Sequence, residues 1–103
     1  MNNDKKFKLI ITIVDKGMAP NVIAASKEGG AEGGTVINGR GSSIYEKGKI
    51  FGFPIEPEKE IIMIVVEQEK EKFVIDEITS KLNIKEKGKG ITFVLDVENV
   101  IGI

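Results

Sequence analysis

The chain has 103 residues, which is the size of one ordinary domain. Hydrophobic residues make up 41% of it, and 15 basic against 16 acidic residues give a net charge of −1. This balance argues against nucleic acid as the main partner, because neutralising phosphates requires an excess of Lys and Arg. The sequence contains neither Cys nor His. Disulfides, thiolate or imidazole metal sites and Ser-His or Cys-His catalysis are therefore excluded, and no metal is expected.

The N-terminal third predicts a strand followed by a short helix. Residues 7–14 are apolar and rich in β-branched side chains, which is typical of a strand. This run is too short for a membrane span, and no signal-peptide cleavage pattern accompanies it, so we expect a cytoplasmic protein. Pro20 fits the first turn of a helix, and Gly29-Gly30 is a helix-ending signal.

A second strand is predicted at 35–37, and Asn38-Gly39 after it predicts a tight turn. Residues 38–57 are rich in Gly and Pro and show no sustained apolar period, which indicates a long loop or a loosely paired ribbon. Residues 60–67 predict a third strand.

The C-terminal third predicts a helix, a loop and a last strand. Val74, Ile78 and Leu82 recur at helical spacing within 70–82. A Lys- and Gly-rich loop follows at 83–90, and 91–95 predicts the fourth strand.

The element order is therefore β-α-β-β-α-β over one domain spanning 1–103. This order predicts a ferredoxin-like α+β fold, with both helices on one face of a mostly antiparallel sheet.

The first and third predicted strands are apolar on both faces. Leu9, Ile11 and Ile13 share one face of the first strand, while Ile10 and Val14 lie on the other. Helices cover only one face of such a sheet, and a bare apolar face usually marks an interface. We therefore expect a cyclic homo-oligomer. The alternative is that the segment after Asp96 covers the second face, but only seven residues of the sequence follow it.

Two loops contain candidate binding residues. Ser42, Ser43 and Tyr45 lie beyond the second strand and are either solvated loop residues or a partner-binding and modification site. Glycines at 88 and 90 alternate with Lys85, Lys87 and Lys89, which suits either an anion site or a solvated basic turn.

The second half of the chain resembles the PII nitrogen-regulatory family. Residues 60–66, 73–82, 88–90 and 92–103 resemble that family's third strand, second helix, B-loop and closing strand. The most specific part is Phe93 to Val97 followed by Val100-Ile101. Thr35-Val36 with Arg40-Gly41 resembles the end of the second strand, where the family's T-loop begins.

The resemblance implies a homotrimeric, non-enzymatic signal-transduction regulator. Such proteins bind ATP, ADP and often 2-oxoglutarate in clefts between subunits, and control enzymes, transcription regulators or membrane transporters through the T-loop. It implies a T-loop-like segment at 41–57, a B-loop-like segment at 83–90 and no nucleic-acid partner. The implied nucleotide contacts are Thr35, Gly41, Lys59, Gly88, Lys89 and Gly90.

The sequence departs from the family pattern in its phosphate-binding cations. Ile91 stands where the family has a basic residue, and the tail reads Val-Ile-Gly-Ile without arginines. The T-loop-like segment is also short, and no counterpart of the family's ligand-binding glutamine follows Gly41. The effector is thus left open among ATP, ADP, AMP and another small anion. Two alternatives are a ligand-independent trimeric assembly module of CutA-like architecture and, less favoured, an enzyme on the same fold.

Overall fold

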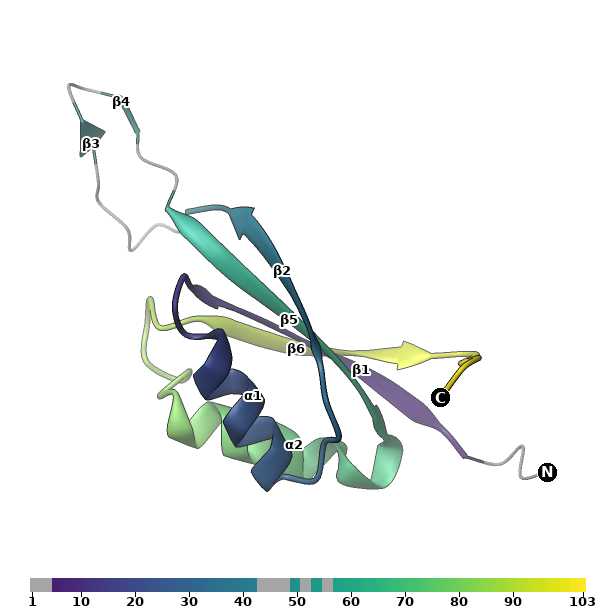
Figure 1. The fold of residues 1–103 in the computed structure, drawn as a ribbon. Coiled ribbons are helices and arrows are strands. Elements are labelled where there is room, and N and C mark those ends of the chain that lie inside the picture. Colours follow the sequence, from purple (N-terminus) through teal and green to yellow (C-terminus); the bar gives the residue numbers. More distant parts are fainter. Residues whose placement is uncertain (1–4, 43–48, 51–52, 55–56) are drawn as a thin grey trace.

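The computed structural model describes residues 5–42, 49–50, 53–54 and 57–103. Figure 1 shows a long sheet with two helices packed along one side. In chain order, the main-sheet strands and the helices are β1 Phe7–Asp15, α1 Ala19–Glu28, β2 Thr35–Arg40, β5 Glu58–Glu67, α2 Gln68–Lys81 and β6 Ile91–Val97. A separate pair of two-residue strands, β3 Lys49–Ile50 and β4 Phe53–Pro54, lies between β2 and β5.

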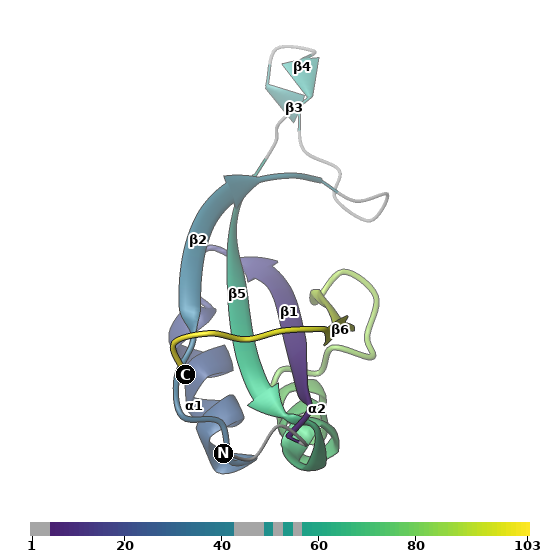
Figure 2. The same ribbon diagram turned by 90° about the vertical axis from the view of Figure 1, so that its right-hand side faces the viewer.

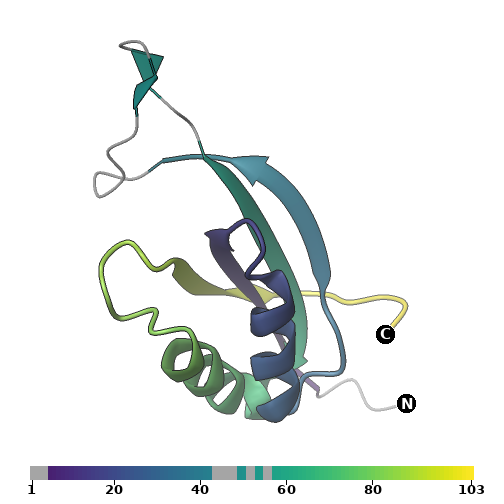
Figure 3. The same ribbon diagram turned by 60° about the vertical axis from the view of Figure 1, so that its left-hand side comes forward.

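The four long strands form one antiparallel sheet in the order β2-β5-β1-β6. The central strand β1 pairs with β5 on one side and with β6 on the other. Both helices cover the same face of this sheet, as Figure 3 shows. The expected ferredoxin-like α+β fold is therefore confirmed.

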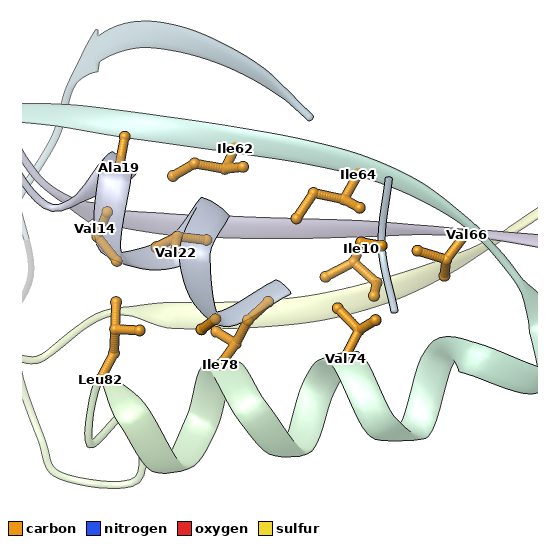
Figure 4. Packing of buried hydrophobic residues seen from close by; sticks show 12 residues of the cluster. Ile10, Val14, Ala19, Val22, Ile62, Ile64, Val66, Val74, Ile78 and Leu82 are labelled. Atoms are coloured by element: carbon orange, nitrogen blue, oxygen red, sulfur yellow. The ribbon is translucent and has the colours of Figure 1, made fainter. Parts of the chain in front are cut away.

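The core lies between the helices and one face of the sheet (Figure 4). Alternate residues of β1 and β5 point toward the helices, and Ile10, Ile62 and Ile64 are fully buried there. Val74 and Ile78 of α2 meet them from the helical side and are also fully buried. Both helix residues belong to the apolar series that the sequence predicts.

The two helices approach each other closely where α1 ends. Pro20 lies in the first turn of α1, and Gly29 caps its C-terminus. A β-carbon added at Gly29 would lie 2.6 Å from the Cα of Val74 in α2, which is too close for any side chain. Glycine is therefore required at this position by the backbone packing of the neighbouring helix.

One local prediction is wrong. The tight turn expected at Asn38-Gly39 does not form, because β2 continues to Arg40. Asn38 pairs with Glu60 and Gly39 with Lys59, so the ladder of β5 holds this segment extended and overrides its turn preference. Within the described residues, no helix is long and apolar enough to cross a membrane.

Candidate functional site

Most of the residues predicted to contact a ligand gather at one end of the sheet, the left end in Figure 1. Gly41 follows directly after Arg40, which pairs with Glu58 in β5. Lys59 is the neighbour of Glu58, and it pairs with Asp15 at the end of β1. Neighbouring strands lie about 4.8 Å apart, so Gly41 and Lys59 are close together. We call this region the loop end, because the segment 41–57 leaves the sheet at this point.

The Gly-Lys loop reaches the same end from the other side of β1. Gly90 has φ +142° and immediately precedes β6. A β-carbon on Gly90 would lie 2.9 Å from the carbonyl oxygen of Ile13, so only glycine fits against β1 at this point. Gly88 also has a positive φ, and Lys89 between the two glycines is exposed. The loop end thus brings together Gly41, Lys59, Gly88, Lys89 and Gly90.

Thr35 lies elsewhere. It begins β2 and pairs with Met63, on the face of the sheet turned away from the helices. Gly41 follows Thr35 by six positions of extended chain, a distance of about 20 Å. A single chain therefore does not bring Thr35 together with the other predicted contacts.

Three consecutive residues of β5 bind the end of β1 and the turn that leads into α1, a cluster of which sequence reasoning found only Lys59. Lys16 Nζ lies 2.8 Å from Glu58 Oε2, and Lys59 Nζ lies 2.6 Å from Asp15 Oδ1. Glu60 Oε1 accepts hydrogen bonds from the backbone N–H of Gly17 at 2.9 Å and of Ala19 at 2.8 Å. We call these contacts the turn clamp. Its signal in the sequence is the Glu-Lys-Glu run at 58–60.

The electrostatics of the turn clamp follow from these contacts. The hydrogen bond from Lys16, and then its charge, hold the pKa of Glu58 below its usual range, and Arg40 adds to the effect. The same pair raises the pKa of Lys16. Both side chains are exposed, so the pair is ionised but surrounded by water.

The face of the sheet opposite the helices is apolar, and we call it the open face. Its residues come from all four long strands: Leu9, Ile11 and Ile13 of β1, Ile37 of β2, Ile61, Met63 and Val65 of β5, and Ile91, Phe93 and Leu95 of β6. Leu95 remains 47% exposed and Ile91 53% exposed. The expectation of strands that are apolar on both sides is thus confirmed in the folded chain.

The C-terminal tail covers only one end of this face. Figure 2 shows residues 98–103 crossing the sheet from β6 toward the side of α1. Val100 and Ile103 line an open pocket there together with Phe7 and Val65. Ile101, by contrast, is 90% exposed. The alternative that the tail buries the open face is therefore not supported, because Ile91 and Leu95 stay uncovered.

The remaining candidate residues divide into two groups. Ser42 is described and exposed, whereas Ser43 and Tyr45 lie outside the described residues. Among the residues that the structure describes, no three His, Cys, Asp or Glu side chains are placed to hold a metal ion.

Comparisons with known proteins place the chain in a family. The family model described as "Nitrogen regulatory protein P-II" matches residues 7–103. A crystal structure of Arabidopsis thaliana PII bound to citrate superposes with a TM-score of 0.72 at 29% sequence identity, covering 100% of this chain and 85% of that one. No curated protein sequence matches significantly. Since the family match covers nearly the whole chain and the folds agree, this protein belongs to the P-II family of nitrogen regulatory proteins.

Proposed function

We propose that this P-II family signal-transduction protein, which as a member of that family is a non-enzymatic regulator, senses a small anionic effector in clefts between the subunits of a homotrimer. The effector class is an adenine nucleotide (ATP, ADP or AMP) or another small anion. Its binding controls a target protein, an enzyme or a membrane transporter, through the T-loop-like segment 41–57. The protein acts in the cytoplasm.

The observation that supports this proposal best is the gathering of Gly41, Lys59 and the B-loop-like residues 88–90 at the loop end. Gly88 and Gly90 there let backbone N–H groups face an anion, and Lys89 adds a positive charge. Because this site adjoins the segment 41–57, an effector bound there would contact the part of the chain assigned to target binding.

The position of Thr35 supports a cleft made by two copies. Thr35 lies about 20 Å from Gly41 along β2, on the open face. A second protomer packed on that face would bring its own loop end toward Thr35 of the first. The site is then complete only in the oligomer.

The open face also supports the homotrimer itself. Fully burying an aliphatic or aromatic side chain is worth about 1.5–3 kcal/mol, and Ile37, Ile91, Phe93 and Leu95 are each more than a third exposed. Identical chains in a closed ring bury the same patch on every copy. Sedimentation equilibrium at micromolar concentration tests this, and a stable folded monomer would rule it out.

Isothermal titration with ATP, ADP, AMP and citrate tests the effector. Citrate is included because the Arabidopsis protein similar to this chain was crystallised with it. Replacing Lys89 by Ala should weaken binding about tenfold or more, because a hydrogen bond to a charged group contributes about 1.5–3 kcal/mol. Lys72→Ala, on the exposed face of α2, is the matched control and should not change the affinity.

A ligand-independent trimeric module of CutA-like architecture is the second candidate. The turn clamp favours it, because Lys16 and Lys59 already have carboxylate partners within the chain. A melting temperature that rises with nucleotide concentration would count against this candidate. Absence of heat in the titration with all four compounds would favour it.

A further inference from the structure

The three contacts of the turn clamp differ in how firmly they are held. The side chain of Lys59 is only 14% exposed where it meets Asp15. The Glu60 carboxylate is fixed by two backbone N–H groups. The Lys16–Glu58 pair is different, because its side chains are 69% and 52% exposed. An ion pair so open to water contributes little and is easily exchanged.

Lys16 occupies a central position at the loop end. In the sheet order, β1 lies between β5 and β6. The turn that follows β1 therefore lies between Lys59 on one side and Gly90 on the other, and Gly90 packs directly on Ile13 and Val14. Lys16 is thus flanked by residues from both predicted halves of the ligand site, although sequence reasoning did not include it.

The backbone of the same turn is not available to a ligand. The N–H groups of Gly17 in the turn and of Ala19 at the start of α1 already donate to Glu60, and those of Lys16 and Met18 donate to backbone carbonyls. An anion arriving at this turn therefore meets the Lys16 ammonium, and it competes there with the carboxylate of Glu58. In the chain without ligand, the carboxylate of Glu58 lies beside the Lys16 ammonium, where such an anion would bind.

We propose that Lys16 is an effector-binding residue whose ammonium is held by Glu58 until a phosphate or carboxylate of the effector displaces that side chain. This inference rests on the proposed function, since it assigns a contact to the same anionic effector.

The displacement of Glu58 would also link effector binding to the segment 41–57. Glu58 immediately follows that segment, and its carbonyl accepts a hydrogen bond from the Lys16 N–H at 3.2 Å. Next to it, the Gly41 N–H donates to the carbonyl of Pro57 at 3.2 Å. Releasing the Glu58 side chain removes one of the contacts that hold the base of the segment, whereas these two backbone bonds and the Lys59–Asp15 pair remain. Effector binding should therefore loosen the base.

The test is the direction in which two variants change effector affinity. Glu58→Gln removes the competitor, so the variant should bind the tightest of ATP, ADP, AMP and citrate about two- to fivefold more strongly than the wild type. Lys16→Gln removes the cation, so its affinity should fall by a similar or larger factor. The double variant should behave like Lys16→Gln. Glu77→Gln, which breaks the exposed pair with Lys81 on α2, is the matched control and should change nothing.

Amide hydrogen exchange by NMR supplies the second readout. Without ligand, Glu58→Gln should speed exchange at the Gly41 and Lys16 amides about two- to fivefold, and effector should produce the same change in the wild type. A purely structural ion pair would make both single variants bind equally or more weakly, and that result overturns the inference. If the wild type binds one of the four compounds but the variants do not change affinity in opposite directions, only the role of Lys16 is overturned. If the wild type binds none of them, the proposed function fails as well.

Discussion

The two faces of the sheet are built from the same kinds of residue but have different surroundings. On the helix side, Ile10, Ile62 and Ile64 are fully buried. On the open face, Leu95 and Phe93 remain 47% and 39% exposed although their side chains are equally apolar. The comparison shows that apolar residue type alone does not bury a face, because a second layer must also cover it. One layer is supplied by the helices, and we propose that sister copies supply the other.

We expect the largest loss of stability from a substitution on the helix side of the sheet. Replacing Ile62 by Ala leaves a cavity against α1 and α2, where the surrounding residues cannot collapse fully. We expect a loss of about 2–5 kcal/mol in the free energy of unfolding, measured by urea denaturation. The loss should persist in any variant that no longer assembles. A loss below about 1 kcal/mol would mean that this side of the sheet is less tightly packed than the structure shows.

A charge on the open face should act on assembly instead. Leu95→Asp places a carboxylate in the proposed interface, where it would be buried without a partner. We expect sedimentation to show a shift from trimer to monomer, with a melting temperature that no longer depends on protein concentration. Glu98→Lys, close by but beyond β6, is the control and should remain assembled. Trimers of Leu95→Asp would contradict the assignment of this face.

At the loop end, the turn clamp gives a smaller effect. Glu60→Ala removes the acceptor from the Gly17 and Ala19 N–H groups, which then lose the partner that caps α1. Loss of a helix cap typically costs about 0.5–2 kcal/mol, and urea denaturation of this variant should show a loss in the same range. Glu86→Gln, an exposed residue in the Gly-Lys loop, should stay within experimental error of the wild type.

The smallest effect concerns pH and the Lys16–Glu58 pair. The pKa of Glu58 is lower in the folded chain than its usual value, so its contribution to stability is present at neutral pH and is lost on acidification below about pH 4. The pKa of Lys16 is raised, so the pair also weakens at strongly alkaline pH. The difference in melting temperature between wild type and Glu58→Gln should therefore be small at neutral pH and should shrink as the pH falls through the range in which Glu58 takes up its proton. A difference that grows on acidification would contradict this account.

The sequence alone predicts most of the fold because its apolar pattern is consistent. The strands are rich in Ile and Val on both faces, and the second helix has Val74, Ile78 and Leu82 at helical spacing. Both patterns indicate one type of secondary structure each. The prediction of a turn at Asn38-Gly39 is wrong because local turn preference takes no account of the neighbouring strand, whose ladder holds both residues extended.

The sequence predicts less of the candidate site than of the fold. Gly41, Lys59 and Gly90 were identified through a family resemblance, and only the register of the strands shows that they lie together.

Apart from Lys59, the charged residues of the turn clamp were missed because each looks like an ordinary surface charge. The contact between Gly17 and Glu60 joins residues 43 positions apart, and that between Asp15 and Lys59 joins residues 44 positions apart. Both depend on how β1 and β5 align, which charge patterns alone do not reveal.

The glycine at the end of α1 limits where this protein can change shape. Because Gly29 lies against the backbone of Val74, the main chains of the two helices have no room to come closer at this point. We therefore expect the helical layer and the strands beneath it to move as one block. Any motion that carries a signal is left to the turns and the segments at the two ends of the sheet.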